Sequence, residues 1–231
     1  MPRLFRALPP VFAGSFDAEQ PWRLLGEPLT EALAGLPTER IEIGLSPDHQ
    51  ISGDRIVIGA GTRIHPTAVV EGPIYIGRDV HIRPGAYLRG GCWIEDGAIV
   101  GANTEVKHSI FLAGARAPHL AYVGDSILGA GVNLGAGTVL SNFRHDGTDI
   151  VIPGDGGGLA TGRRKLGALL GDGVQTGCNC VLHPGSIVGT ETVVYAGVQL
   201  RAGVHPAERV IKLRQQIETV ERHPRASRDG E

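Results

Sequence analysis

The stretch 58–112 reads IGAGTRIHPTAVVEGPIYIGRDVHIRPGAYLRGGCWIEDGAIVGANTEVKHSIFL, and every sixth residue in it is aliphatic. These positions are Ile58, Ile64, Val70, Ile76, Ile82, Leu88, Ile94, Val100, Val106 and Leu112. Glycine recurs just after the aliphatic residue or three residues after it, as in IGAG. A helical period of 3.6 residues fits badly, and so does two-residue alternation. An inward aliphatic residue, a short strand and a tight corner in each hexad predict a solenoid in which three hexads form one triangular coil.

The six-residue spacing continues beyond this stretch. It returns at Leu128, Leu134 and Leu140, and again over 170–200 with Thr176 as the exception. Coils stack about 4.8 Å apart, so about eight of them should form an elongated prism. The pattern resembles the left-handed parallel β-helix of hexapeptide-repeat proteins, and the fold class that we expect is therefore all-β.

The repeat also divides the chain into parts. Residues 1–50 precede it and contain a predicted short helix over Pro21–Leu36. Residues 51–205 should form the β-helix, with a long loop at 143–165 where the spacing disappears. Loops of that length tend to be functional or mobile.

The C-terminal part, residues 206–231, is expected to hold a helix and a tail. Residues 206–222 read PAERVIKLRQQIETVER, in which the proline suits the first turn of a helix. The predicted helix would cap the exposed end of the solenoid or pack in a trimer.

Composition excludes several classes of partner. The 231 residues include 35 glycines, carry a net charge of −2 and have only 5% aromatic residues, so nucleic acid is not expected as the main partner. No apolar run approaches the roughly 18–20 residues that span a bilayer, so no membrane partner is expected. Three cysteines without metal-like spacing suit the cytoplasm. Cys92 and Cys180 occupy small inward positions and are predicted to be core residues, and no metal site is expected.

The stretch 117–126, APHLAYVGDS, breaks the spacing. Sixteen residues separate Leu112 from Leu128 where a full coil has eighteen, and Pro118 falls in an aliphatic position. This alignment places His119 above Gly101, beside a notch in the wall of the prism. A histidine is by type more often a surface or packed residue than a catalyst, but the shortened coil makes His119 a candidate.

A second candidate is a column of charged corner residues. Glu71, Arg89 and Lys107 are spaced eighteen residues apart, so they should stack on one edge. Two stacked cations repel unless an anion lies between them, which predicts a phosphate clamp. The alternative is a surface network in which Glu71 and Glu105 neutralise both cations. Asn142, where the chain enters the long loop, is either a loop anchor or a site residue.

The stretch EVKHSIFLAGARAPHLAYVGDSILGAGVNLGAGTVLSNFRHDG (105–147) resembles the acetyltransferase half of a bacterial bifunctional enzyme family. That family couples a glucosamine-1-phosphate N-acetyltransferase to an N-acetylglucosamine-1-phosphate uridylyltransferase in UDP-N-acetylglucosamine synthesis. The stretch TGRRKLGALLGDGVQTGCNCVLHPG (161–185) is still more similar to archaeal sugar-1-phosphate nucleotidyltransferases with a C-terminal acetylating β-helix. The nucleotidyltransferase domain is not expected here, because about fifty residues precede the repeats and the glycines of GAGTR (59–63) lie in phase with them.

The resemblance implies an acetyl-CoA-dependent N-acetyltransferase of hexosamine-1-phosphates, with a site between the prisms of a homotrimer. It implies that His119 is the general base and that Asn142 orients the sugar amine. Arg89 and Lys107 correspond to the phosphate clamp, and the other implied substrate contacts are Glu105, Tyr122 and Asn133. The implied coenzyme contacts are the Ala136 backbone N–H, as an oxyanion donor, Cys178 and Ala196.

One departure concerns a family lysine that follows the asparagine. This chain has Thr148 near that place, and Arg144, Arg163, Arg164 or Lys165 could substitute. The identity of the amino sugar stays open, and a separate nucleotidyltransferase is a candidate partner.

Two other functions compete. One is a non-catalytic prism that binds sugar phosphates or trimerises a partner. A scaffold would gain nothing from keeping together His119, Asn142, Arg89 and Lys107. The other is a metalloenzyme of the carbonic anhydrase type, which needs three converging imidazoles. The histidines His65, His81, His108 and His119 show no matching spacing.

Overall fold

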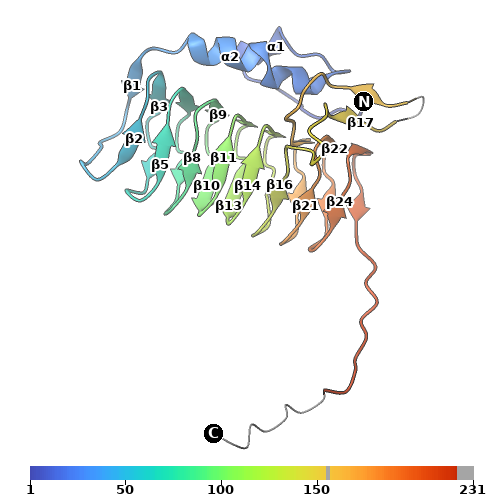
Figure 1. Cartoon of the computed structure of the whole chain (residues 1–231). Helices are drawn as coiled ribbons and strands as arrows, with labels where there is room; N and C mark the ends of the chain where they lie inside the picture. The colour runs from blue at the N-terminus through green and yellow to red at the C-terminus, as the bar shows by residue number, and fades with distance from the viewer. Residues whose placement is uncertain (155–156, 223–231) are drawn as a thin grey trace, which may run out of the picture.

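A computed structural model describes residues 1–154 and 157–222 as a three-faced prism of stacked, parallel β-strands (Figure 1). The nine-stranded face, sheet A, contains β1 (Glu39–Ile41), β3 (Ile56–Ile58), β6 (Ile74–Ile76), β9 (Cys92–Ile94), β12 (Ile110–Phe111), β15 (Ile127–Leu128), β19 (Ala168–Leu170), β22 (Ser186–Val188) and β25 (Gly203–His205). The all-β fold class predicted from the repeat is confirmed: the chain is a left-handed β-helix of hexapeptide repeats.

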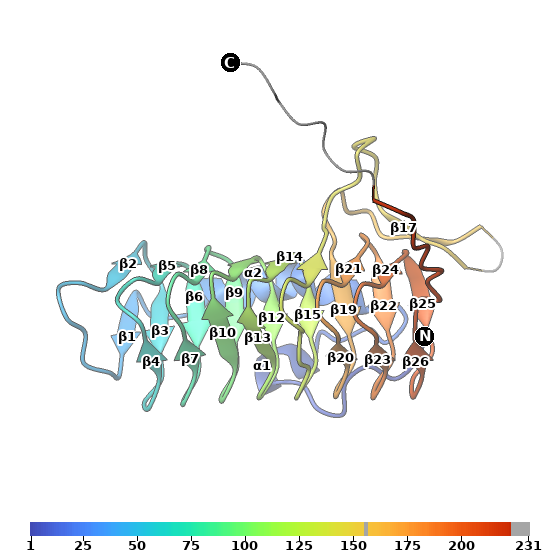
Figure 2. The same ribbon diagram turned by 90° about the horizontal axis from the view of Figure 1, so that it is seen from below.

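The other two faces complete each coil, and their strands lie in rows along the prism (Figure 2). Sheet B contains β2 (Gln50–Ser52), β5 (Val69–Glu71), β8 (Tyr87–Leu88), β11 (Glu105–Lys107), β14 (Tyr122–Gly124), β16 (Val139–Leu140), β21 (Val181–Leu182) and β24 (Gln199–Leu200). Sheet C is split into β4 (Arg63–Ile64), β7 (His81–Ile82), β10 (Ile99–Ala102) and β13 (Arg116–His119), and β20 (Gln175–Thr176), β23 (Val193–Val194) and β26 (Val210–Ile211). Bridges from Arg116 through Asn133 to Gln175 join its two parts.

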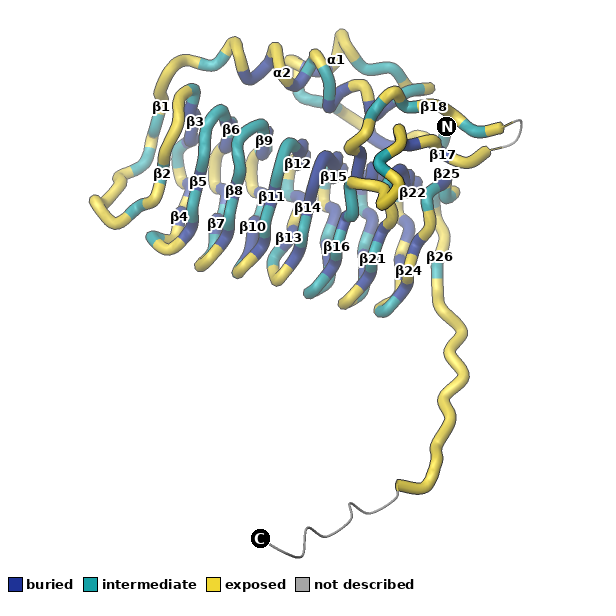
Figure 3. The backbone as a smooth tube through the Cα atoms, viewed as in Figure 1, coloured by how far each residue is buried: buried dark blue, intermediate teal, exposed yellow. Residues whose placement is uncertain are grey.

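The interior of the prism is filled by the aliphatic residue of each hexad. Leu88 pairs with Val106, eighteen residues further on, and both are fully buried. Cys92 and Cys180 lie in the same core, as predicted, and burial raises the pKa of the Cys92 thiol to about 12. Figure 3 shows the buried inner positions alternating with exposed corners along each coil.

The expected alignment around APHLAYVGDS is wrong by one residue. Phe111, not Leu112, pairs with Ile94 and enters the prism core. Ala117 therefore pairs with Val100, and His119 lies above Ala102, not above Gly101. Compared with an unbroken six-residue repeat, the chain is one residue short between Val106 and Phe111. It is one residue short again between Val123 and Leu128. The sequence IFL offers two apolar registers, and the larger Phe111 side chain fills the interior.

The N-terminal segment covers the outer face of sheet A (Figure 1). It contains α1 (Pro10–Ala13), the 3-10 helix η1 (Pro21–Leu25) and α2 (Glu27–Ala34). The helix expected over Pro21–Leu36 is thus broken at Gly26, whose ψ of −129° is not helical. The buried residues of the N-terminal segment, including Phe12 and Trp22, pack in one cluster with Trp93 on sheet A. This cover makes the outer face of sheet A apolar as well as its inner face.

The long loop, expected at 143–165, forms a hairpin that leaves the prism near one end (Figure 2). Within it, β17 (Val151–Ile152) pairs antiparallel with β18 (Leu159–Ala160). Ile150 and Ile152 are buried in the cluster that holds the N-terminal segment down. The hairpin is therefore anchored at its first strand, β17.

The expected C-terminal helix is not present in the described part of 206–222. Glu208 has a φ of 56°, a left-handed backbone that an α-helix excludes, and Val210–Ile211 instead continue the solenoid by pairing with β23. The strands therefore extend from Glu39 to Ile211, past both of the expected limits at 51 and 205. Residues 212–222 run away from the prism, and residues 223–231 lie outside the described residues.

Among the described residues, no helix has the length and apolar character needed to cross a bilayer.

Candidate functional site

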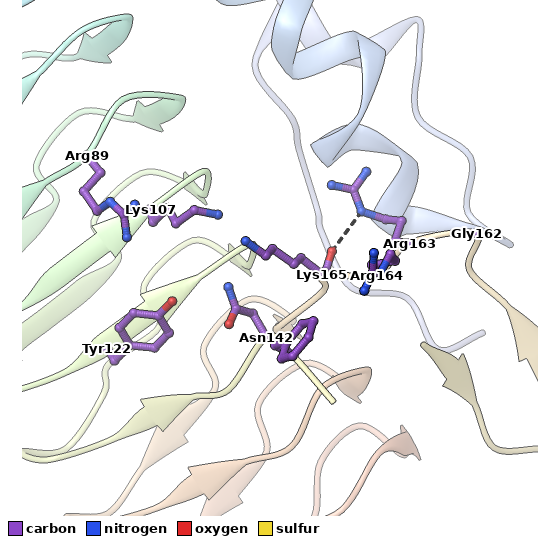
Figure 4. A pocket seen from close by; sticks show the side chains of 9 residues that line it. Arg89, Lys107, Tyr122, Asn142, Gly162, Arg163, Arg164 and Lys165 are labelled. Carbon is purple, nitrogen blue, oxygen red and sulfur yellow. Dashed lines mark hydrogen bonds between the residues drawn. The ribbon is translucent and has the colours of Figure 1, made fainter. Parts of the chain in front are cut away.

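Four residues predicted for the site line one open cavity of about 830 Å³ (Figure 4). We call it the cationic pocket. Its lining residues are Arg89, Lys107, Tyr122, Asn142, Phe143, Gly162, Arg163, Arg164 and Lys165. Arg89, Lys107 and Asn142 lie at the corner between sheets B and A, and Tyr122 lies on β14 of sheet B. Phe143 and residues 162–165 belong to the two ends of the hairpin. Five of the nine lining residues are cationic, so the pocket is suited to an anion.

Arg89 and Lys107 stack on successive coils, as expected, because each follows a residue of the Leu88–Val106 pair. The Arg89 guanidinium lies 3.0 Å from Glu105 Oε1. Lys107 Nζ lies 3.1 Å from Asp125 Oδ2. Glu71 does not join this network and accepts a hydrogen bond from the Tyr87 hydroxyl at 3.0 Å. The two cations are therefore partly compensated, by Glu105 and by Asp125, and the second of these is a residue that the sequence analysis missed.

Asn142 lies in the pocket wall at the point where the chain leaves the prism. Its Nδ2 donates to Asp125 Oδ2 at 2.6 Å, and its backbone oxygen accepts from the Leu166 N–H of the returning strand. A Cβ on Gly124 would lie 2.6 Å from Asn142 Nδ2 and 2.7 Å from the Tyr122 hydroxyl, so only glycine leaves room for both side chains. Asn142 is thus both a loop anchor and a pocket residue.

Tyr122 presents its phenol to the pocket from β14. Burial is the main cause that raises its pKa, and the nearby carboxylates of Glu105 and Asp125 raise it further. The hydroxyl therefore stays protonated at neutral pH and can donate a hydrogen bond to an anion.

The hairpin brings three further cations that sequence reasoning had named only as substitutes for a lysine. An antiparallel bridge between Phe143 and Lys165 sets its base. The Arg163 guanidinium donates to the Leu25 and Lys165 backbone oxygens at 3.2 and 3.3 Å, and burial lowers its pKa. Arg164 Nε donates to the Gly147 oxygen at 3.1 Å. Within the described residues, none of Arg163, Arg164 and Lys165 has a carboxylate within 4.0 Å.

Two other residues stand outside this group. Arg144, another candidate substitute, pairs with Asp146 at 2.6 Å and does not line the pocket. Thr148 also bonds to Asp146, through its hydroxyl at 2.9 Å. The side chains of Arg144, Asp146 and Thr148 therefore bond to one another within the turn at 144–148.

His119 lies at the other edge of sheet B, at the end of β13 and before β14. It is exposed and is not among the residues that line the cationic pocket. The three residues of β14 separate this corner from the one that carries Lys107, a span of about 10 Å. The structure thus places the predicted base at the corner between sheets C and B, outside the pocket.

The implied coenzyme residues lie on the same edge as His119. The backbone N–H groups of the residues after Ala136, Cys178 and Ala196 each donate to the carbonyl of the corner residue one coil below. His119, Ala136, Cys178 and Ala196 therefore form one continuous file, which we call the His119 column. The Ala136 N–H has no acceptor among the described residues. Small side chains above His119 leave the edge open to an elongated ligand.

Asn133 is not brought to either group. It lies on sheet C, between Arg116 and Gln175, around the corner from the pocket. Within one chain the predicted substrate contacts are therefore divided between two faces.

No cluster of three or more His, Cys, Asp or Glu side chains suited to a metal ion occurs in the described ranges.

Comparisons with known proteins agree with the repeat. Residues 55–90 and 73–108 match the family model described as "Bacterial transferase hexapeptide (six repeats)". A "Bifunctional sugar-1-phosphate nucleotidylyltransferase/acetyltransferase" from Sulfurisphaera tokodaii is 39% identical over 121 residues, which cover 52% of this chain and 30% of the relative. A "Bifunctional protein GlmU" from Methanococcus maripaludis is 32% identical over 140 residues, which cover 61% of this chain and 34% of the relative.

The matched region thus spans about a third of the length of these curated relatives. A solved hexapeptide transferase family protein from Anaplasma phagocytophilum is 17% identical, with a TM-score of 0.28 over 75% of this chain and 87% of that one. The resemblance drawn from the sequence motifs is confirmed by the curated relatives over about half of the chain.

Proposed function

We propose that this hexapeptide-repeat chain, homologous over about half its length to sugar-1-phosphate nucleotidyltransferase/acetyltransferases, is an acetyl-CoA-dependent N-acetyltransferase of a hexosamine-1-phosphate. The observation that carries the proposal is the charge of the cationic pocket. Five cations line it, and among the residues that the structure describes only Arg89 and Lys107 have carboxylate partners. A phosphate monoester, which is close to a dianion at neutral pH, would supply the missing negative charge.

In this proposal the sugar phosphate binds in the pocket and the amine points along sheet B toward His119. The amine nitrogen attacks the thioester carbon, so that a C–N bond forms and the C–S bond breaks. His119 takes a proton from the nitrogen and returns it to the departing thiolate. The Ala136 N–H, one coil above, would donate to the oxygen on which negative charge develops.

The His119 column supports the coenzyme part of the proposal. Ala136, Cys178 and Ala196 are small residues on three successive coils, so a long, thin molecule could lie along the edge without a clash. When bound, acetyl-CoA would supply the activated acetyl group. The chain's own residues would hold it beside His119.

The distribution of the site residues supports a homotrimer. The cationic pocket lies at one edge of sheet B, His119 lies at the other edge, and Asn133 lies on sheet C. A neighbouring prism could enclose all three. We place this trimer in the cytoplasm and expect a separate nucleotidyltransferase to use its product.

The test is an acetyl-transfer assay with glucosamine-1-phosphate and galactosamine-1-phosphate, in which the release of the coenzyme thiol is measured. The unphosphorylated amino sugars are the control for the pocket, and His119→Ala is the control for the base. We expect turnover with at least one phosphate and a fall in kcat of about 100-fold or more in His119→Ala at unchanged oligomeric state. An intact trimer that binds coenzyme but turns over neither phosphate would overturn the proposal. Sugar-phosphate binding without turnover would then favour the non-catalytic alternative.

A further inference from the structure

A three-residue ladder of polar side chains runs along the corner between sheets B and A. His108, Asp125 and Asn142 each lie two residues after paired core positions, so they occupy the same place on three successive coils. Asn142 Nδ2 lies 2.6 Å from Asp125 Oδ2, and His108 Nδ1 lies 3.3 Å from Asp125 Oδ1 in a geometry that falls short of a hydrogen bond. Asp125, in the middle, contacts both of its neighbours in the ladder and also Lys107.

Asp125 is a buried and fully ionised carboxylate. It is 4% exposed, and burial alone would raise its pKa. Contacts from His108, Asn142 and Lys107 outweigh that effect and hold the pKa at about 2. An ionised carboxylate can only accept hydrogen bonds. Each neighbour must therefore turn a donor toward Asp125.

This requirement fixes the orientation of the Asn142 amide. An asparagine side chain can rotate to exchange its nitrogen and oxygen, and both arrangements fit the same space. Because Asp125 accepts only, Nδ2 faces the carboxylate and Oδ1 points away from it. The Asn142 oxygen can accept a hydrogen bond from an amine N–H. The lone pair of the amine nitrogen would then be free to point toward the thioester carbon.

The same carboxylate oxygen holds Lys107. Its Nζ lies 3.1 Å from Asp125 Oδ2, and the side chain is 20% exposed where that of Arg89 is 40% exposed. Lysine has a flexible stem with four rotatable bonds, and a buried partner removes much of that freedom. One Asp125 oxygen thus sets the position of two pocket residues at once.

We propose that Asp125 is a positioning residue, which directs the Asn142 oxygen and the Lys107 ammonium into the cationic pocket. The proposal rests on the proposed acetyltransferase function for its kinetic consequence, but not for its geometry. Asp125 would not touch the reacting atoms and would act only through its two neighbours.

The chain offers a matched control. Asp172 is 3% exposed and also stacks at a corner of the prism, where it accepts from the Ala130 and Arg6 backbone N–H groups at 2.8 and 2.7 Å. It does not line the cationic pocket. Asp125→Asn and Asp172→Asn therefore remove the same charge from equally buried sites, and a general loss of fold would appear in both.

The kinetic test is a double-mutant cycle with Asn142→Ala. We expect Asp125→Asn to lower kcat about tenfold or more in the wild-type background, because the new amide allows Asn142 to rotate. On Asn142→Ala we expect a smaller fall, because only the contact with Lys107 is left to lose. Asp172→Asn should change kcat by less than about twofold in both backgrounds. An equal effect of Asp125→Asn in both backgrounds, or none in the wild type, would overturn the proposal.

A second measurement does not depend on activity. The ¹⁵N resonance of the Asn142 side-chain amide, assigned by its loss in Asn142→Ala, should shift in Asp125→Asn and stay unchanged in Asp172→Asn. The absence of a shift in Asp125→Asn would overturn the proposal. If the wild-type chain fails to acetylate any amino sugar phosphate, the proposed function fails alone, and this resonance still decides the role of Asp125.

Discussion

Ala136 stands directly above His119 on one edge of the prism, since the Gly137 N–H donates to the His119 carbonyl at 3.2 Å. Neighbouring coils lie about 4.8 Å apart, so the predicted base and the predicted oxyanion donor are within reach of a single carbonyl group and the amine that attacks it. The shortened coil brings these two residues into register. Cys178 and Ala196 extend the same file.

Cys178 provides a chemical test of the His119 column. It is the exposed thiol among the three cysteines, while burial raises the pKa of both Cys92 and Cys180. We expect one thiol per native chain to react with iodoacetamide, and the adduct to block binding of acetyl-CoA. Mass spectrometry and coenzyme titration measure the two effects. Cys178→Ser should bind coenzyme and resist the reagent; labelling at Cys92 or Cys180 in folded protein would contradict the prediction.

Lys165 should contribute to binding of the phosphate. It is an exposed cation at the base of the hairpin, without a carboxylate within 4.0 Å in the described part of the chain. We expect Lys165→Ala to raise KM for the sugar phosphate about tenfold, equivalent to about 1.4 kcal/mol, with kcat changed less than about threefold. Lys212→Ala, on the segment that leaves the prism, is the control. Equal KM values for both variants would show that Lys165 does not contribute to binding of the phosphate.

Leu120, next to His119, occupies a strained position. Its φ is 51°, and the same corner of neighbouring coils carries Asn103, Gly137 and Asn179, residue types that tolerate this backbone. Leu120 is also 61% exposed, so packing within the chain does not offset the strain.

We expect Leu120→Asn to raise the free energy of unfolding by about 1 kcal/mol. Because backbone strain is often retained at functional positions, acetyl transfer should fall in the same variant. Thermal unfolding and initial rates measure the two effects, with His65→Asn on a distant coil as the control. A lower Tm in Leu120→Asn would contradict the argument.

The ionisation of Asp125 predicts how stability depends on pH. The pKa in the folded chain, about 2, lies below the ordinary value of 3.8, so the group stabilises the fold fully above about pH 4. This contribution, about 2 kcal/mol, is lost as the pH falls through 2. Asp125→Asn should therefore flatten the acid side of the stability profile between about pH 4 and 2 and leave the slope above pH 5 unchanged. An acid slope equal to that of the wild type would show that Asp125 is not the group that titrates.

Much of the fold follows from the sequence because each hexad supplies its own inward residue. The pairing of Leu88 with Val106, and hence the stack of Arg89 and Lys107, depends only on a constant coil length. The alignment at APHLAYVGDS was wrong because Phe111 and Leu112 are both apolar. Only the space inside the prism distinguishes them.

The features that the sequence did not reveal arise from contacts between distant segments. The C-terminal segment forms β26 because an open strand edge on β23 is available to it. Asp125 becomes part of the site because it stacks between His108 and Asn142, each seventeen residues away along the chain. Neither relationship has a local sequence signal.

By itself, the sequence determined the left-handed β-helix and the two stacked cations, since both follow from a local period. The tertiary structure decided that the 143–165 hairpin returns beside Asn142, so that Arg163, Arg164 and Lys165 join Arg89 and Lys107 in one pocket. It also decided that a buried carboxylate orients Asn142. The physical reason is that burial and charge compensation depend on which side chains meet across coils, and a repeat period does not specify where an inserted hairpin comes back.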